Sequence, residues 1–249
     1  MIELKNISKS FNGRNILENV SSSFEKGHIN LVIGGSGSGK TVMMKCMVGL
    51  VEIDKGEILY DEQLFSGLSR KERTPFRQQI GMVFQGGALF DSLTVEQNVM
   101  FPLNMFTRMP IEEKRERVNF CLQRVNLANS NKLTPSELSG GMKKRVAIAR
   151  AIAPNPSFLF FDEPNSGLDP QTSIVIDNLI KEITEEFNIT TIVNTHDMNS
   201  VLEIGDKILF LFKGKKWWEG SVDDILRTDN KEINEFIFAS KLAKAIKKV

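Results

Sequence analysis

The chain has 249 residues, of which 41% are hydrophobic and 25% are charged, as in an ordinary globular protein with a sizeable core. Its formal net charge of +1 provides no strong field for a polyelectrolyte, so we expect no nucleic-acid partner. The two cysteines, Cys46 and Cys121, have no metal-like spacing and imply no disulfide framework, which favours a reducing cytoplasm.

The first part of the chain predicts a strand, a glycine-rich turn and a helix in succession. Apolar residues between Ile2 and Ile7 indicate an opening strand, and a polar stretch follows from Ser8 to Asn15. Residues 29–33 read as a buried strand that runs directly into the glycine-rich turn, and residues 42–50 read as an apolar helix after it. Strand, loop and helix in this order are the context that a phosphate-binding loop needs.

Helical patterns dominate the middle of the chain, and strands alternate with helices after it. Thr94 followed by Gln97 resembles a capping box, and a further helix is expected from Ser139 to about Ala153. The later expected elements are a strand at 158–162, a helix at 170–187, and strands at 190–194 and 207–212. This alternation predicts an α/β fold with a mostly parallel sheet.

The glycine-rich turn matches the phosphate-loop pattern G-x-x-x-x-G-K-[ST]. Glycines allow the backbone N–H groups to curl around phosphate oxygens, and the following helix N-terminus adds partial positive charge. Lys40 can reach the outer phosphates, and the Thr41 hydroxyl can bind Mg²⁺. The motif consists of Gly34, Gly35, Ser36, Gly37, Ser38, Gly39, Lys40 and Thr41.

Two acidic residues end the apolar strand at 158–162. Asp162 suits a Mg²⁺ ligand acting through water, because this ion keeps much of its hydration. Glu163 suits a base or positioning group for an attacking water. An acidic strand end is weak evidence alone, but together with the phosphate loop it indicates nucleotide hydrolysis.

A third motif, Leu138-Ser139-Gly140-Gly141-Met142, stands before a basic helix. Here the chain resembles the ABC ATPase family, whose signature is L-S-G-G-Q. Ser139 and the two glycine amides lie at a helix N-terminus, where they can hold a γ-phosphate. An N-capped surface helix would explain the serine but not the two glycines that follow it.

The resemblance extends over nearly the whole chain. Gln85 is similar to the Q-loop glutamine that senses Mg²⁺ and water, and His196 to the switch histidine that contacts the γ-phosphate. The D-loop at the dimer interface is resembled by Ser166-Gly167-Leu168-Asp169. Phe11 resembles the aromatic residue that stacks on adenine. The implied fold is a P-loop NTPase cassette with a mostly parallel core sheet, an antiparallel β subdomain and a helical signature subdomain.

The same resemblance implies a homodimer that hydrolyses ATP with Mg²⁺ at two shared sites. In each site the phosphate loop of one chain faces Ser139, Gly140, Gly141 and Asp169 of the other. The implied catalytic residues are Glu163, His196 and Gln85, and the implied Mg²⁺ ligands are Thr41, Gln85 and Asp162. We expect one ATPase domain over residues 1–249, with a helical subdomain at about 86–155 and a C-terminal helical tail at about 221–249.

Within the family, residues 86–103 and Met142 resemble the lipid-transport branch known as Mla or MCE-linked ATPases. This implies a permease partner, MCE-type lipid-carrier subunits and phospholipid cargo moved across a bacterial envelope. Another importer or exporter ATPase, or a division-associated cassette, is the alternative. A soluble ABC protein acting on ribosomes or DNA is disfavoured, because the chain has one motif set and no long heptad region.

The apolar runs of the chain are too short to span a bilayer, which needs about 20 residues. We therefore expect a peripheral subunit on the cytoplasmic face of the inner membrane. An apolar groove is expected to receive a short helix of the permease, although about half of its candidate residues should be core instead. The candidates are Leu89, Phe90, Phe101, Met105, Phe106 and Met109.

Overall fold

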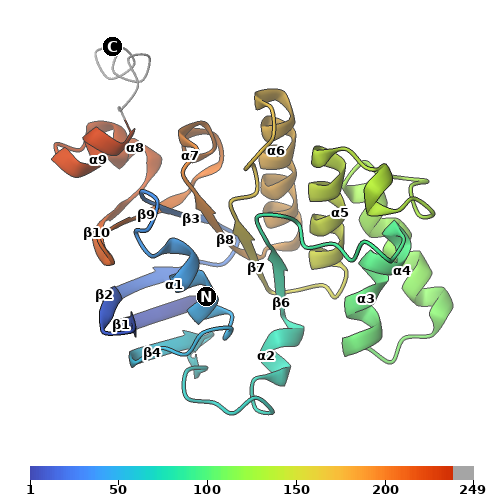
Figure 1. Cartoon of the computed structure of the whole chain (residues 1–249), viewed down its shortest axis with the longest axis horizontal. Coiled ribbons are helices and arrows are strands. Elements are labelled where there is room, and N and C mark those ends of the chain that lie inside the picture. Colours follow the sequence, from blue (N-terminus) through green and yellow to red (C-terminus); the bar gives the residue numbers. More distant parts are fainter. Residues whose placement is uncertain (238–249) are drawn as a thin grey trace. The chain divides into compact units, whose positions relative to one another are not determined.

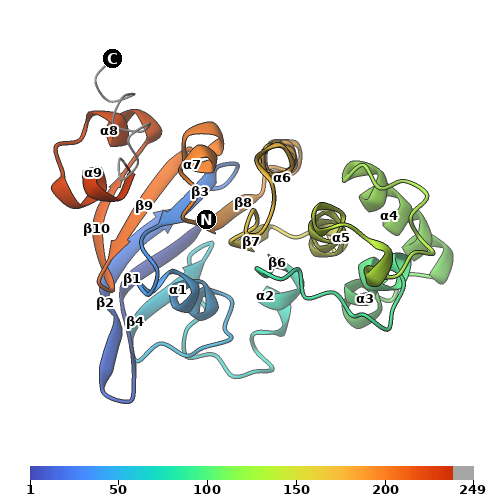
Figure 2. The ribbon, with the colours of Figure 1, turned by 45° about the horizontal axis from the view of Figure 1, so that its top comes forward.

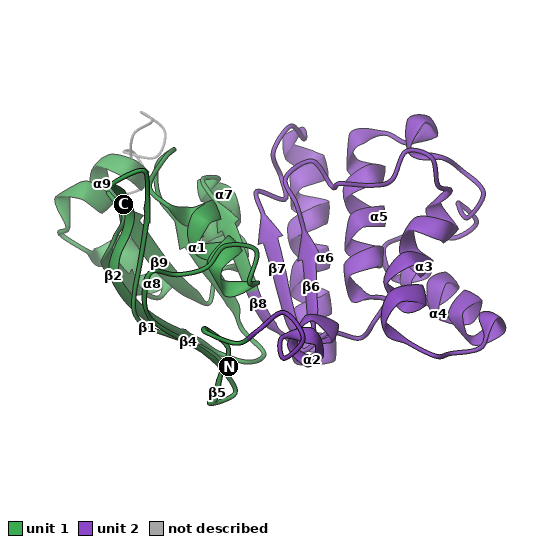
Figure 3. Cartoon of the chain, turned by 60° about the horizontal axis from the view of Figure 1, so that its bottom comes forward, with its two compact units in different colours: residues 1–68, 192–249 green, residues 69–191 purple. Residues whose placement is uncertain are grey.

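The computed structural model describes residues 1–237 of the chain. These residues form two compact units, one made of residues 1–68 with the chain from residue 192 onward, and the other of residues 69–191 (Figure 3). The prediction of a single ATPase domain stays a prediction. The end of the expected C-terminal tail, residues 238–249, lies outside the described residues.

The first unit contains a four-stranded sheet in the order β2-β1-β4-β5. Its strands are β1 Ile2–Phe11, β2 Arg14–Phe24, β4 Lys55–Tyr60 and β5 Gln63–Leu64, and each neighbouring pair is antiparallel. The polar stretch from Ser8 to Asn15 is mostly strand. Only Asn12 and Gly13 lie outside β1 and β2, and these two residues have positive φ and form the tight turn between the strands. An Asn-Gly pair is the favoured sequence for such a hairpin turn. This sheet is the predicted antiparallel part of the fold.

The first unit also contains strands β3 Ile29–Ile33, β9 Lys207–Phe212 and β10 Lys215–Gly220. β3 pairs with β9 in parallel, and β9 pairs with β10 in antiparallel orientation. All five residues of β3 are buried, as expected for a parallel strand covered on both faces. The helices are α1 Lys40–Met47, α7 Met198–Ile204, α8 Val222–Arg227 and α9 Lys231–Ile237. α9 packs on β9 through Phe236 and Phe210, whose ring centroids are 5.4 Å apart. Figure 2 shows α9 beside the end of the strands β9 and β10.

The second unit has parallel strands β6 Ile80–Val83 and β7 Phe158–Asp162. Its helices are α2 Thr74–Gln78, α3 Val95–Phe106, α4 Ile111–Arg124, α5 Gly140–Ile152 and α6 Pro170–Phe187, with a 3₁₀ turn at Pro135–Glu137 (Figure 1). β8 Thr190–Thr195 begins in this unit and ends in the first. Thr94 forms the predicted capping box with Gln97 at the start of α3. Helices α3, α4 and α5 fall within the expected helical range of about 86–155.

The buried faces of α3, α4 and α5 meet to form the core of this helical part. Val99 and Leu103 from α3, Val118 from α4 and Val146 from α5 are all fully buried. The guanidinium of Arg117 on α4 donates to the carbonyls of Ile152 and Ala153 at 2.8 and 2.9 Å, where α5 ends. Such bonds satisfy last-turn carbonyls that have no partner within the helix. Arg117 therefore fixes the C-terminal end of α5, the helix that follows the signature motif.

Candidate functional site

The phosphate loop lies between β3 and α1, in the predicted strand–loop–helix order. Gly34 has φ of 150° and Gly39 has φ of 108°, conformations that favour glycine. A Cβ atom on Gly34 would lie 2.3 Å from the Leu211 carbonyl oxygen, and one on Gly39 would lie 2.9 Å from the Ile16 carbonyl oxygen. The close approach of neighbouring backbone thus requires glycine at both positions.

Lys40 is the first residue of α1, and its side chain is buried against the loop. Its ammonium donates to the carbonyl of Gly34 at 2.8 Å and to that of Gly35 at 3.3 Å. The positive charge is therefore held inside the curl of the loop, at the N-terminus of a helix. Both features favour an anionic ligand such as a phosphate group.

The acidic strand end belongs to the second unit. Asp162 is the last residue of β7 and is buried, and Glu163 follows it half-buried with φ of 52°. A left-handed conformation at a glutamate is uncommon and costs free energy, so the surrounding contacts must hold it. Asp162 and Glu163 thus differ in burial and in backbone conformation, which suits separate roles for them.

Ser139 is the N-cap of α5, and its hydroxyl oxygen accepts from the amide of Met142 at 3.3 Å. Ser139 and Gly140 are exposed, so the first amides of the helix are open to a ligand. Gly141 has a second reason to be glycine, because a Cβ atom there would lie 2.6 Å from Cγ2 of Thr172. The two glycines thus differ: the first leaves the helix end open, and the second allows α6 to approach.

The structure brings the predicted Q-loop glutamine and D-loop together within the second unit. The side-chain amide of Gln85 donates to the Ser166 hydroxyl at 3.2 Å. Asp169 caps α6 by accepting from the Thr172 amide at 3.0 Å and the Thr172 hydroxyl at 2.5 Å. These bonds from Thr172, the hydroxyl first, hold the pKa of Asp169 below its usual value. Asp169 is therefore an exposed anion at a fixed helix start.

The remaining predicted nucleotide contacts, Phe11 and His196, are both exposed in the first unit. Phe11 ends β1, and the ammonium of Lys9 lies 5.1 Å from its ring centroid. His196 directly follows β8, next to Asp197, which caps α7. Both side chains are thus accessible to a ligand rather than part of the core.

The predicted Mg²⁺ ligands offer an alcohol, an amide and a carboxylate, the hard oxygen donors that this ion prefers. Thr41 belongs to the first unit, whereas Gln85 and Asp162 belong to the second. Within residues 1–237, no group of three or more His, Cys, Asp or Glu side chains could hold a metal ion.

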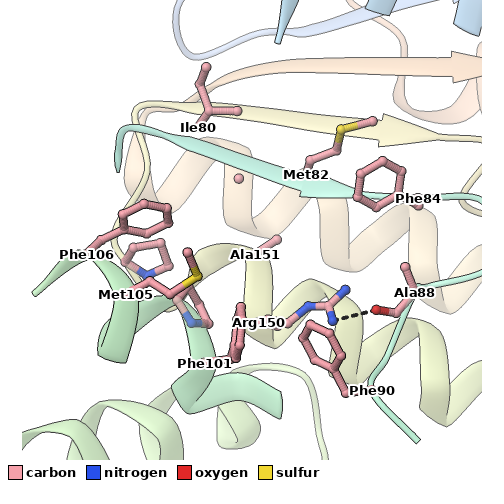
Figure 4. Close-up of a pocket in the computed structure, with 13 residues that line it drawn as sticks. Ile80, Met82, Phe84, Ala88, Phe90, Phe101, Met105, Phe106, Arg150 and Ala151 are labelled. Atoms are coloured by element: carbon pink, nitrogen blue, oxygen red, sulfur yellow. Dashed lines mark hydrogen bonds between the residues drawn. The ribbon is translucent and has the colours of Figure 1, made fainter. Parts of the chain in front are cut away.

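A groove of about 400 Å³ lies on the second unit, lined largely by apolar side chains (Figure 4). Phe90, Phe101, Met105 and Phe106 line it, as predicted, whereas Leu89 and Met109 do not. The expectation that half of the six candidates are core is wrong, since none of them is buried. Phe101, Met105 and Phe106 belong to α3, Leu89 and Phe90 precede it, and Met109 follows it. The opposite face of α3 packs on α4 and α5, which leaves this face open.

Sequence reasoning missed two cations on α5 that fasten the loop after β6. The Arg150 guanidinium donates to the carbonyls of Gly87 and Ala88, each at 2.7 Å, and also lines the groove. The Lys144 ammonium donates to the carbonyls of Gln85 and Glu163. Their partners lie far away in the sequence, so only the position of Lys144 on the buried face of α5 could have indicated one of these contacts.

These features define a cassette that binds and hydrolyses a nucleoside triphosphate. The chain belongs to the ABC transporter family, whose model matches residues 17–166. It is therefore an ATPase that uses ATP and Mg²⁺, and its fold is the predicted P-loop cassette. No helix among residues 1–237 has the length and hydropathy needed to cross a membrane.

Two curated relatives from different transport systems are similarly close. The intermembrane phospholipid transport system ATP-binding protein MlaF of Haemophilus influenzae is 39% identical over 95% of this chain and 90% of its own length. The methionine import ATP-binding protein MetN of Campylobacter jejuni is 37% identical over 95% of this chain and 75% of its own length. Either relative is similar enough to establish the family, but because the two serve different transport systems they do not identify the transported molecule.

The fold is also that of a solved ABC ATPase. A dimeric structure of the ATP-binding cassette MJ0796 in a post-hydrolysis state, bound to ADP and Pi, superimposes with a TM-score of 0.83. The sequence identity is 35%, and the match covers 89% of this chain and 99% of the other. This neighbour supports ATP hydrolysis as the activity of the chain.

Proposed function

We propose that the chain powers phospholipid transport across a bacterial envelope, as the ATP-hydrolysing subunit of a complex with an integral-membrane permease. The observation that carries this proposal is the similarity to MlaF over almost the full length of both chains. Met142 and residues 86–103, which resemble the lipid-transport branch, add to it. MCE-type carrier subunits are the further partners that this branch implies.

The working unit in this proposal is a homodimer on the cytoplasmic face of the inner membrane. In each of its two sites, residues 34–41 of one chain hold the phosphates while Phe11 stacks on adenine. Ser139, Gly140, Gly141 and Asp169 of the other chain close the site. The open N-terminus of α5 and the exposed anion Asp169 support these assignments, because both are available to a second chain. The dimeric state of MJ0796 also supports them.

For the reaction itself, we assign the proton-accepting or water-orienting role to Glu163, and we assign His196 and Gln85 as the further catalytic residues. Bound Mg²⁺ supplies electrostatic neutralisation of the phosphate oxygens, and Thr41, Gln85 and Asp162 would hold it. The left-handed backbone of Glu163 supports its assignment, because strain of this kind is stored where the orientation of a side chain matters.

The groove beside α3 is proposed to receive a short cytoplasmic helix of the permease. Phe90 and Phe101 pack against each other with ring centroids 4.7 Å apart and ring planes tilted by 48°, and Phe90 is 42% exposed. Large aromatic side chains kept in water are unfavourable, and they are typical anchors of protein interfaces. The guanidinium of Arg150 lies 6.0 Å from the Phe90 ring centroid, which favours an acidic side chain or a helix C-terminus on the incoming helix.

Methionine import is the second candidate, favoured by the similarity to MetN. The two candidates are separated by isolating the tagged chain from membranes and identifying its partners and lipids by mass spectrometry. We expect a permease with MCE-type proteins and bound phospholipid. ATPase activity of the reconstituted complex should then respond to phospholipid and not to methionine. A methionine-stimulated complex without lipid carriers would contradict the lipid proposal and leave the ATPase assignment intact.

A further inference from the structure

Lys144 is a buried cation in the first half of α5, the helix that Ser139 caps. It is only 6% exposed, whereas the preceding residue, Lys143, is partly exposed. The neighbouring buried residues on this helix are apolar, among them Val146 and Ala147. Removing a lysine ammonium from water costs much free energy, so its burial on the apolar face of α5 requires hydrogen bonds that offset this cost.

The compensation comes from two backbone carbonyls on different loops. The Lys144 ammonium donates to the carbonyl of Gln85, which follows β6, and to the carbonyl of Glu163 at 3.4 Å, which follows β7. These two residues are the proposed water-orienting glutamine and the proposed base. One cation therefore joins the signature helix to both catalytic loops of the same chain.

The bond to Glu163 falls at the strained point of its loop. Glu163 has φ of 52°, and a non-glycine residue keeps such a conformation only where its surroundings enforce it. A charged donor on its carbonyl fixes the orientation of that peptide group, and hydrogen bonds to charged donors are the stronger ones. Burial lowers the pKa of Lys144, while the charge of Glu163 raises it.

The second loop is fixed in the same way. Gln85 is held by Lys144 at its carbonyl and by the Ser166 hydroxyl at its side-chain amide, 3.2 Å away. Ser166 itself belongs to the loop that follows Glu163. A displacement of Lys144 would therefore disturb both Gln85 and Glu163.

We propose that Lys144 is a positioning residue for ATP hydrolysis, holding Gln85 and Glu163 of its own chain in register with the helix that Ser139 caps. The inference rests on the proposed roles of these three residues. In the dimer, Ser139 closes on the ATP bound by the partner chain. Lys144 then relays the position of that helix to the catalytic loops of its own site, and so links the two sites through a buried contact.

The test compares Lys144→Met with Lys143→Met, which removes the same charge one residue away. A misplacement of about 1 Å at a reacting centre costs up to about a hundredfold in rate. We expect Lys144→Met to lower kcat at least about tenfold while KM for ATP changes less than about twofold. Lys143→Met should keep both values.

A second readout separates positioning from damage to the signature helix. Lys144→Met is combined with Glu163→Gln, and ATP-driven dimerisation is measured by light scattering. Dimerisation equal to that of Glu163→Gln alone, together with the fall in kcat, is the expected result. Lost dimerisation would show that Ser139 was displaced and would overturn the inference, as would an unchanged kcat in Lys144→Met.

Two further variants keep the outcome decisive. Should Lys144→Met be too unstable to purify, Lys144→Gln keeps a hydrogen-bond donor of similar size and is expected to retain an intermediate kcat. A kcat equal to that of the unaltered chain in Lys144→Gln would overturn the inference. Glu163→Gln alone tests the underlying assignment: if it hydrolyses ATP normally, the proposed base is wrong, whereas an inactive Glu163→Gln with an active Lys144→Met rejects only the positioning role.

Discussion

The ammonium of Lys40 donates to the carbonyl of Gly34, 2.8 Å away, across the loop that both residues frame. The lysine ammonium is thus held against the loop that is predicted to bind the phosphates. Because its side chain is buried, its charge is less screened by water than that of a surface lysine. This arrangement gives a direct prediction for nucleotide binding.

Lys40→Ala should lose both ATP binding and hydrolysis. A hydrogen bond to a charged group contributes about 1.5–3 kcal/mol, so ATP affinity should fall by at least about tenfold. Isothermal titration calorimetry with MgATP measures this change. Lys45→Ala, in the last turn of the same helix, is the matched control and should bind normally. Tight ATP binding by Lys40→Ala would count against the phosphate-loop assignment.

Glu163→Gln should abolish turnover while leaving ATP-driven dimerisation intact. The amide cannot accept a proton as the carboxylate does, and loss of a general base costs about a hundredfold or more in rate. Steady-state phosphate release measures turnover, and size-exclusion chromatography with ATP measures dimerisation. Glu116→Gln, an exposed glutamate on α4, should behave like the unaltered chain. Normal ATPase activity in Glu163→Gln would defeat the assignment.

Phe90→Asp should uncouple the chain from its permease without unfolding it. Phe90 is 42% exposed, so the isolated chain should lose no more than about 0.5 kcal/mol of stability and should bind ATP normally. In a complex, however, the carboxylate would be buried against apolar side chains at a large cost. Pull-down of the permease and transport in vesicles measure the effect. Met109→Asp, equally exposed but outside the groove, is the control, and intact coupling in Phe90→Asp would refute the groove proposal.

Asp54 links the start of β4 to the end of β1 near Phe11, and its contribution should depend on pH. It accepts from the Lys9 ammonium at 2.6 Å and from the amide and hydroxyl of Ser10, each at 2.7 Å. These bonds, with the one from Lys9 first, lower the pKa of Asp54 from 3.8 to about 2. A lowered pKa means that the stabilisation is complete above the unfolded value and is lost as the pH falls toward the folded one.

Asp54→Asn should therefore lower the melting temperature at neutral pH, and the difference from the unaltered chain should shrink as the pH falls from about 4 to about 2. Circular dichroism melts across this range measure it. Asp223→Asn, an exposed carboxylate at the start of α8, serves as the control. A difference in melting temperature that stays constant with pH would show that the Asp54 carboxylate is not the group involved.

The elements that carry the motifs could be predicted because their signals are local. The helix expected at 170–187 is α6, and the strand expected at 158–162 is β7. The second strand of the opening hairpin, β2, was not predicted, because the stretch from Ser8 to Asn15 is polar and the Asn12-Gly13 turn was not recognised within it. The groove was predicted, but neither the partial or full exposure of all six candidate residues nor the contacts of Lys144 could be, because they depend on which distant segments meet. Lys144 and Gln85, for example, are 59 residues apart.

Gly141 offers a test of the packing between the signature helix and α6 that is independent of nucleotide. A Cβ atom there would lie 2.6 Å from Cγ2 of Thr172, so Gly141→Ala should destabilise the chain by about 1–3 kcal/mol, as overpacking does. Thr172→Ser removes that methyl group but keeps the hydroxyl that donates to Asp169. Once the methyl group is absent, alanine should be the better residue inside a helix, by up to about 1 kcal/mol.

The effect of Gly141→Ala should accordingly change sign between the two backgrounds: destabilising with Thr172 and neutral or stabilising with Thr172→Ser. Urea unfolding of the four proteins in this cycle measures it. Gly140→Ala is the comparison, because a Cβ atom there meets only Cδ2 of Leu168, at an ordinary 3.7 Å. If Gly141→Ala were equally destabilising in both backgrounds, the contact with Thr172 would not be the reason for this glycine. Glycine at position 141 would then be required only for binding the nucleotide.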